Sequence, residues 1–269
     1  EDIFIMFQYL TLTHRQNWNY QNPFSSFTTN YVGFQLRITL IHESLSPSHM
    51  PKAFIRILGQ TKFSLEDFCP STNEFEHIKQ MLEAKENVII CGSTGSGKTS
   101  LLNAMMAKIS LEAHTVIMED TDEIICRSPF WTKLLSQNGI EGKTLRDFCT
   151  YALRISPQRM ILGEMRSHEV VPFILAMNSG HKGLLSTIHA NSAQDAISRL
   201  ALLFCINSNT DLSFNQVQKL VVRNVDRIIF VENKKIKEMI RPLGVENDIA
   251  YFEKSYTKSE WAKASASSF

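Results

Sequence analysis

The segment Gly92–Thr99 constrains this chain more than any other feature of its sequence. It reads Gly-Ser-Thr-Gly-Ser-Gly-Lys-Thr, which fits the phosphate-binding loop pattern G-x-x-x-x-G-K-[ST] at every position. The context agrees, because Asn87–Cys91 has the apolar run of a buried strand and Leu101–Ile109 has helical spacing. A strand, a glycine loop and a helix in this order let backbone N–H groups wrap around phosphates. The sequence therefore predicts a nucleotide-binding site.

The loop also predicts individual roles. We expect Lys98 to reach the β- and γ-phosphates of ATP and the Thr99 hydroxyl to hold Mg²⁺. The expected nucleotide-binding residues are Gly92, Ser93, Thr94, Gly95, Ser96, Gly97, Lys98, Thr99 and the adjoining Ser100. The alternative is a Gly/Ser surface loop, but such a loop does not usually lie between two apolar runs.

Length and composition narrow the function classes. The chain has 269 residues, 43% hydrophobic and 20% charged, which is typical of a folded protein with one large or two smaller domains. Its net charge of +1 gives no general electrostatic reason to bind nucleic acid. No apolar run reaches the roughly 18 residues of a membrane-spanning helix, and the acidic start does not resemble a secretory signal. The first residue is not Met, which suggests a fragment.

The cysteines do not indicate a metal site. The chain has five, at scattered positions and with no C-x-x-C pair. We expect reduced, packed thiols and no zinc.

The chain divides by pattern into a partial, β-rich N-terminal domain at 1–58, a linker at 59–70 and a larger α/β domain at 71–269. In the first part, 33–41 alternates as a half-buried strand does, and 53–58 is a candidate partner strand. The larger domain starts with Ser71 and Glu74 in capping-box spacing, which predicts a helix.

After the glycine loop, helical and strand-like patterns alternate. Strands are expected at 115–119, 160–164 and 184–189, helices at 145–154, 170–177 and from Ser192, and a late hairpin at 225–231 and 235–240. This alternation predicts a largely parallel sheet covered by helices, and 262–269 is expected to be a loose tail.

Two carboxylates end predicted strands, as catalysis beside a phosphate loop requires. Glu119 follows 115–118 and Glu164 follows 160–163. Ligands bind at the carboxyl ends of strands in such sheets, so we expect both acids to face the same crevice as Lys98. Downstream, His181 and His189 lie eight residues apart without an evident third metal ligand, and they are more plausible as hydrogen-bonding sensors of phosphate or of a neighbouring subunit.

Four of these segments together resemble one family. Gly92–Thr99, Glu119–Thr121, Leu162–Arg166 and Gly180–Ser192 match, in order and spacing, the Walker A, aspartate, Walker B and histidine boxes of the type II/type IV secretion ATPases. The resemblance covers about residues 20 to 240 and implies a RecA-like motor domain with a small N-terminal domain. Asn19–Pro23 and the short connection between the domains are most similar to the Vir-type branch, which serves conjugation and effector export.

The resemblance implies roles for particular residues. Glu119 matches the catalytic glutamate that polarises the attacking water, and Glu164 matches the Walker B acid that organises Mg²⁺ through water. His189, with His181 as a second member, matches the histidine box near the γ-phosphate.

Arginines are implied as well. Arg37 and Arg56 fall where arginines of the N-terminal domain contact nucleotide phosphates in relatives, although an exposed strand arginine is the alternative for both. Arg154 and Arg166 are further candidates, acting across a subunit interface.

The chain also departs from the family pattern. Gln158 stands where members often have Asp before the arginine of the Walker B strand, the N-terminal domain looks shortened, and the four-cysteine zinc insert of many type II members is absent.

The leading hypothesis from this resemblance is a cytoplasmic, Mg²⁺-dependent ATPase that forms a homo-hexamer. It would hold ATP between its two domains and power a type IV secretion or conjugation apparatus at the inner membrane. Its implied partners are that apparatus and its coupling ATPases, with peripheral membrane association and no direct nucleic-acid contact. Three alternatives stay open: a pilus or DNA-uptake motor of the same superfamily, a DNA-translocating helicase, and a nucleotide-bound scaffold that does not hydrolyse.

Overall fold

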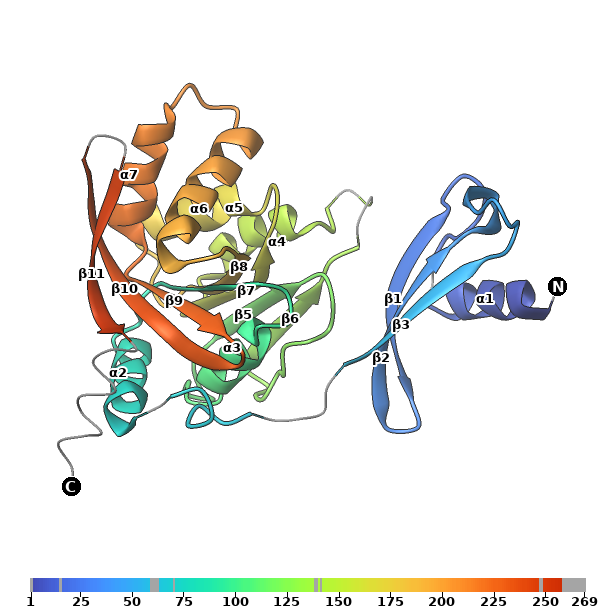
Figure 1. Cartoon of the computed structure of the whole chain (residues 1–269), viewed down its shortest axis with the longest axis horizontal. Helices are drawn as coiled ribbons and strands as arrows, with labels where there is room; N and C mark the ends of the chain where they lie inside the picture. Colours follow the sequence, from blue (N-terminus) through green and yellow to red (C-terminus); the bar gives the residue numbers. More distant parts are fainter. Residues whose placement is uncertain are drawn as a thin grey trace. The chain divides into compact units, whose positions relative to one another are not determined.

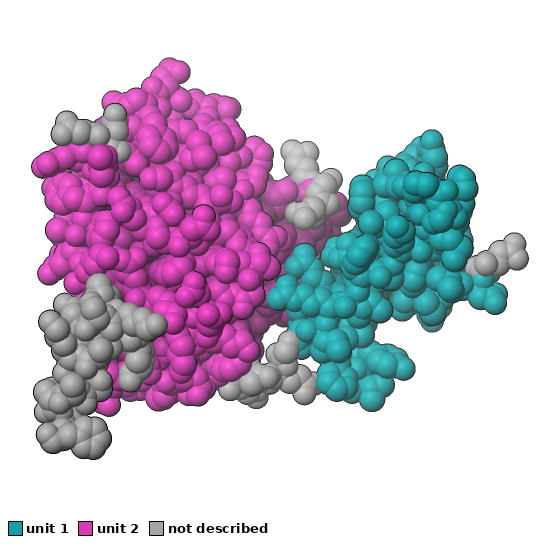
Figure 2. Space-filling view, in the orientation of Figure 1, with its two compact units in different colours: residues 1–61 teal, residues 62–269 magenta. Residues whose placement is uncertain are grey.

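The computed structural model forms two compact units, Glu1–Thr61 and Lys62–Phe269, coloured separately in Figure 2. The residues described are 2–14, 16–58, 63–69, 71–137, 140, 142–246 and 249–257. Each unit is described by itself below. In these ranges, none of the helices is both long and apolar enough to cross a membrane.

The N-terminal unit is a helix packed on a three-stranded sheet (Figure 1). Its elements are α1 (Asp2–Thr13), β1 (Phe24–Tyr31), β2 (Phe34–Ile41), a 3₁₀ turn (Glu43–Leu45) and β3 (Lys52–Leu58). The strands are antiparallel in the order β1-β2-β3. The buried side chains of Phe7, Trp18, Phe27, Ile38 and Leu40 form its small core.

The two strands predicted in this unit are confirmed, but α1 was missed. Its sequence is apolar on nearly all sides: Phe7 is buried on the sheet, whereas Ile5, Tyr9 and Leu12 are exposed. A helix without a polar face lacks the 3.6-residue periodicity from which helices are recognised. The N-terminal region is therefore mixed α/β and not only β-rich.

The second unit is an eight-stranded sheet between two layers of helices. Its strand order is β11-β10-β9-β4-β8-β7-β5-β6, parallel from β9 to β6, with β10 and β11 antiparallel. The strands are β4 (Val88–Gly92), β5 (Thr115–Glu119), β6 (Trp131–Leu135), β7 (Arg159–Met165), β8 (Leu185–His189), β9 (Arg227–Glu232), β10 (Lys235–Glu246) and β11 (Ile249–Thr257). The helices are α2 (Thr72–Glu83), α3 (Lys98–Met106), α4 (Leu145–Ala152) with a 3₁₀ turn (Leu153–Ile155), α5 (Val170–Asn178), α6 (Ala193–Asn207) and α7 (Phe214–Asn224).

Buried residues on both faces of the strands explain the two helical layers. Along β4, Ile89 and Cys91 face the core under α4 to α7, and Val88 and Ile90 face the core under α2 and α3 (Figure 1). A strand covered on both sides reads as a continuous apolar run, which is the pattern that predicted it. The predicted covered, largely parallel sheet is confirmed.

The start of the second unit differs from the expected linker. Within the segment 63–69, Leu65 and Phe68 are fully buried in the core beneath α2 and α3, so these residues are part of the unit's packing. The capping box predicted at Ser71 and Glu74 is present at the start of α2. Residues 59–62 and 70 of the expected linker, and the expected tail at 262–269, lie outside the described residues.

The parallel strands set the position of the site. The strands β4, β8, β7 and β5 are neighbours in that order and run in one direction, so their carboxyl ends meet at one edge of the sheet. Gly92, His189, Glu164 and Glu119 lie at or next to those ends. This edge carries most of the residues that the sequence analysis singled out.

Candidate active site

The glycine loop leaves the first turn of α3 open for a ligand. The residue before the helix, Gly97, has a left-handed φ of 105° and provides no side-chain cap. Gly95 has a φ of 75°, and a Cβ there would meet nothing within 4 Å, so its backbone faces open space. The free N–H groups of a helix start attract anions. The shape of the loop therefore suits an anion such as phosphate.

Packing on the other side of the loop also requires glycine. A Cβ on Gly92 would lie 2.3 Å from the carbonyl oxygen of Val231, and the buried Ser96 Oγ, which has no hydrogen-bond partner, would be 2.5 Å from it. The Lys234 backbone N–H donates to the Ser96 carbonyl at 2.8 Å, which fixes the loop against the β9–β10 turn.

Lys98 is held under the loop by neutral acceptors. Only 7% of the residue is exposed. Its Nζ donates to the carbonyl oxygens of Gly92 at 3.0 Å and Ser93 at 2.9 Å, and to Nδ1 of His189 at 3.3 Å. Burial lowers the pKa of this ammonium group. Anionic phosphate oxygens would be stronger partners for a buried ammonium than these carbonyls.

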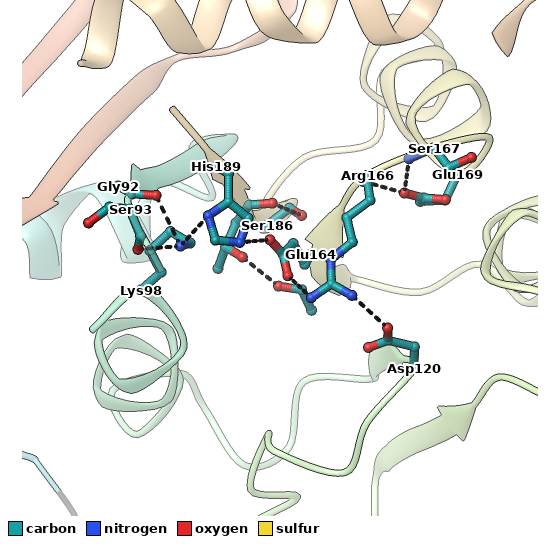
Figure 3. A network of polar contacts seen from close by, with 12 residues as sticks. Gly92, Ser93, Lys98, Asp120, Glu164, Arg166, Ser167, Glu169, Ser186 and His189 are labelled. Atoms are coloured by element: carbon teal, nitrogen blue, oxygen red, sulfur yellow. Dashed lines mark hydrogen bonds and ion pairs between the residues drawn. The ribbon is translucent and has the colours of Figure 1, made fainter. Parts of the chain in front are cut away.

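A continuous series of side chains leads away from Lys98 (Figure 3). His189 Nε2 lies 2.6 Å from Glu164 Oε1. Glu164 in turn pairs with the Arg166 guanidinium, whose Nη1 lies 3.0 Å from Asp120 Oδ2. The strand ends therefore bring together the phosphate-loop lysine, the histidine of the fourth motif and the second predicted acid.

The contacts of His189 define its protonation. An ammonium group can only donate, so Nδ1 of His189 accepts from Lys98 and the ring proton is on Nε2, the atom that faces Glu164. Burial, with the charges of Lys98 and Arg166, lowers the pKa of His189, against the opposing effect of Glu164. The lowered pKa favours the neutral imidazole, which contacts both Lys98 and Glu164.

Glu119 has a different set of partners, on β6 and in the loop that follows β5. Only 3% of it is exposed. Its carboxylate lies 2.7 Å from Lys133 Nζ and accepts from the backbone N–H groups of Glu123 at 3.1 Å and Ile124 at 3.0 Å. Burial raises the pKa of Glu119 to about 7, although Lys133 and the two N–H groups act in the opposite direction.

The residues at the edge fit Mg²⁺ and ATP. Thr99 is half-buried at the start of α3, next to Lys98. Glu164 supplies a carboxylate near the end of β7, which is separated from β4 by β8, and 14% of its side chain is exposed. Hydroxyl and carboxylate oxygens are the ligands that Mg²⁺ prefers, and the open glycine loop provides the phosphate cradle.

Within the described part of the larger unit, His181 and Arg154 do not take part in this series of contacts. His181 follows α5 and its Nδ1 lies 3.2 Å from Ser179 Oγ. Arg154 is exposed, 5.6 Å from the ring centre of Tyr151. Arg37 and Arg56 belong to the N-terminal unit, where they are directly opposite each other on β2 and β3. They line a shallow hollow of that sheet together with Thr39, Ala53, Phe54 and Ile55.

Two partners in the site were not foreseen. Arg166 was considered for a contact between subunits, but within the chain it pairs with Glu164 and Asp120. Lys133 was not considered, because β6 was not predicted. The available signal was a single lysine in the short, partly apolar run Trp131–Leu135.

Comparisons with known proteins find sequence matches over much of the chain. A family model described as "Type II/IV secretion system protein" matches residues 33–253. The conjugal transfer protein TrbB of Rhizobium radiobacter is 32% identical over 178 residues, which are 64% of this chain and 53% of TrbB. The type IV secretion system protein VirB11 of Bartonella quintana is 30% identical over 181 residues, or 66% of this chain and 49% of VirB11.

Solved structures share the fold. The pilus retraction motor PilT with bound ADP matches with a TM-score of 0.62 at 19% identity, covering 91% of this chain and 70% of that one. The chain spans about half the length of the two sequence relatives it matches.

Proposed function

Because this chain belongs to the type II/IV secretion system protein family, we propose that it is a Mg²⁺-dependent ATPase whose hydrolysis powers a type IV secretion or conjugation apparatus. The observation that best supports the proposal is the series of contacts from Lys98 through His189 to Glu164 behind an open glycine loop. Through one imidazole, these contacts connect a cation suited to phosphate with a carboxylate that can organise a metal.

The binding step follows from the contacts of the loop. Backbone N–H groups of the loop and of α3 would receive the phosphates, and Lys98 would exchange its bonds to the carbonyls of Gly92 and Ser93 for bonds to phosphate oxygens. Bound Mg²⁺ would neutralise charge on the β- and γ-phosphates, with Thr99 as a ligand and Glu164 holding it through water.

The chemical step requires a base beside the γ-phosphate. We assign this role to Glu119, whose carboxylate would polarise the attacking water. His189 contacts both Lys98 and Glu164, and Glu164 contacts Arg166. A movement of Lys98 with the γ-phosphate would therefore be transmitted through His189 to Glu164 and Arg166. Arg37 and Arg56 are directly opposite each other, and like charges so placed repel unless an anion lies near. Their proposed role is to contact nucleotide phosphates.

At the level of the assembly, we propose a homo-hexameric ring at the cytoplasmic face of the inner membrane, associated peripherally with the apparatus and its coupling ATPases. Two relatives support this choice of pathway, since they carry the names of a conjugal transfer and a type IV secretion protein.

The test is ATP hydrolysis, with and without Mg²⁺, over a range of protein concentrations, with light scattering after size exclusion on the same samples. We compare the natural chain with Lys98→Ala and Glu119→Gln. The matched control is Lys254→Met, which removes an exposed lysine paired with Glu238 at 2.9 Å.

We expect turnover that rises with ring formation, disappears in both site variants and persists in the control. A monomer that binds ATP but does not hydrolyse it would indicate a nucleotide-bound scaffold and would contradict the motor function.

A further inference from the structure

Lys133 is the cation that contacts Glu119. It lies on β6, the edge strand next to β5, and its Nζ is 2.7 Å from Glu119 Oε1. The same ammonium group also contacts the carboxylate of Asp122 and donates to the carbonyl oxygen of Ile124. One side chain therefore joins β6, the end of β5 and the loop between them.

This arrangement is buried. The side chain of Glu119 is 3% exposed and that of Lys133 is 18% exposed. A buried carboxylate is stable in its charged form only when it is paired and hydrogen-bonded. Both carboxylate oxygens of Glu119 meet this condition. Oε1 contacts the Lys133 ammonium and the Ile124 N–H, and Oε2 accepts from the N–H groups of Glu123 and Ile124.

We propose that Lys133 is a positioning residue for ATP hydrolysis: it holds the carboxylate of Glu119 in its charged form and in one orientation at the end of β5. The inference rests on the proposed function, because it assigns Lys133 a role through Glu119. Lys133 itself need not touch the nucleotide.

The groups that face Glu119 give the pH dependence its sign. Lys133 comes from β6, the backbone N–H groups of Glu123 and Ile124 come from the loop, and the neutral Gly163 of β7 lies against the Glu119 Cβ. Asp122 contacts Lys133 on the same side. Burial raises the pKa of Glu119 to about 7 while Lys133 lowers it, so removal of the ammonium would raise this pKa further.

The experiment measures kcat and KM for ATP between pH 5.5 and 9 in the full chain. The variants are Lys133→Met, Lys133→Gln and Lys133→Arg, with Glu119→Gln as the inactive reference and Lys254→Met as the control. Binding of a fluorescent ATP analogue and the melting temperature are measured in parallel, so that loss of fold is recognised. Lys133→Gln keeps a hydrogen-bonding group and serves if Lys133→Met does not fold.

We expect the acid limb of the kcat profile to move up by about one to two pH units in Lys133→Met and Lys133→Gln. At pH 7 this corresponds to a loss of roughly 5- to 50-fold in kcat, with KM and analogue binding nearly unchanged. Lys133→Arg keeps the positive charge and should therefore keep the kcat profile of the natural chain.

Two results would overturn the inference while leaving the proposed function intact. An equal loss of kcat at every pH would mean that Lys133 only shapes the loop, and a kcat above that of the natural chain would mean that it restrains Glu119 from acting. If instead the natural chain does not hydrolyse ATP, the proposed function itself fails.

Discussion

A buried charge needs a partner, and the charged residues of this site satisfy that need in different ways. Glu119 has an ammonium group and backbone N–H groups, whereas Lys98 has carbonyl oxygens and a neutral imidazole. The first arrangement is complete without a ligand. Among the described residues, the second has no anionic partner in direct contact, and phosphate would supply one. This difference suits Lys98 to its proposed role of binding phosphate, and Glu119 to its proposed role as a base that is held in position.

His189→Ala tests whether the imidazole links binding to catalysis. Removing it leaves the bonds of Lys98 to Gly92 and Ser93 in place, so nucleotide affinity should change by less than about threefold, which is about 0.65 kcal/mol. Hydrolysis should fall by about tenfold or more, because Glu164 loses the contact that orients it. Equilibrium binding and kcat are measured on the same preparation, with the exposed His168→Ala as the matched control. A kcat that falls equally in both variants, or that does not fall in His189→Ala, would contradict a linking role.

Arg159 is a buried cation whose charge is only partly compensated, since its Nε and Nη1 have no hydrogen-bond partner among the described residues. It is 6% exposed, and its guanidinium donates to the Leu82 carbonyl in the last turn of α2. A cation at a helix C-terminus is stabilising, and burial lowers the pKa of this arginine. Arg159→Ala should therefore reduce the free energy of unfolding by about 2–4 kcal/mol, through the cavity and the lost bond, as measured by urea titration. The exposed Arg223→Ala should change it by less than about 0.5 kcal/mol. If Arg159→Ala lowered the free energy of unfolding as little as Arg223→Ala, Arg159 would not have this stabilising role.

At the scale of elements, the helices α2 and α4 each begin with a capping box that contains an acid, and the two acids lie in opposite environments. In α2, Glu74 is fully buried, one of its carboxylate oxygens has no hydrogen-bond partner, and burial raises its pKa to about 7. In α4, Asp147 accepts from the hydroxyl and N–H of Thr144, which lowers its pKa. One motif therefore produces two opposite pH dependences.

The sign follows from proton linkage. The folded pKa of Glu74 lies above its ordinary value, so its contribution to stability is complete below about pH 4.5 and is lost as the pH rises through about 7. Glu74→Gln should remove this loss, narrowing the difference in unfolding free energy between pH 5 and pH 8 by roughly 1–3 kcal/mol. Asp147→Asn is the matched control: the lowered pKa of Asp147 makes its contribution complete above about pH 3.8 and lost only in stronger acid, so this variant should leave the difference between pH 5 and pH 8 unchanged. Urea unfolding at both pH values measures the effect, and an unchanged difference in Glu74→Gln would refute it.

Elements next to strong local signals could be predicted from the sequence. The apolar run of β4, the glycine loop and the capping box of α2 are local, and each is present as expected. The helix α7 also carries a capping box, at Ser213 and Gln216, but this signal was overlooked. The short strand β6 mixes polar and apolar residues, and β11 at the sheet edge has no distinct boundary in the sequence.

The residues of the candidate site also differ in whether a local sequence signal could predict them. The four motifs identified Lys98, Glu164 and His189, and parallel strand order brings these three together. The pairing of Glu119 with Lys133 depends on β6 lying beside β5, and no spacing in the sequence encodes that neighbour. Tertiary packing therefore decides which cation an acid meets, although local pattern decides where the acid lies.

At the scale of the molecule, the two units have cores of very different size. The N-terminal unit has a few buried apolar side chains around Trp18, whereas the larger unit has two extensive cores on the two faces of its sheet. A unit of about 60 residues buries a smaller share of its surface on folding than a larger one, so its stability is lower. We therefore expect unfolding in two steps, with the N-terminal unit first.

Trp18 makes this prediction measurable. It is 5% exposed, and its ring centre lies 5.1 Å from that of His42 and 5.6 Å from that of Phe4. The chain has three tryptophans, and the substitutions Trp131→Phe and Trp261→Phe leave only Trp18. Its fluorescence then reports on the N-terminal unit, while circular dichroism follows mainly the larger unit.

Addition of ADP at about 100 times its Kd should raise the free energy of unfolding of the larger unit, the second transition, by about 2.7 kcal/mol, because the phosphate loop lies in that unit. A parallel rise of the Trp18 transition would assign part of the nucleotide contacts to Arg37 and Arg56, and Arg56→Ala should then remove that rise alone. A single transition seen by both probes would contradict the independence of the two cores.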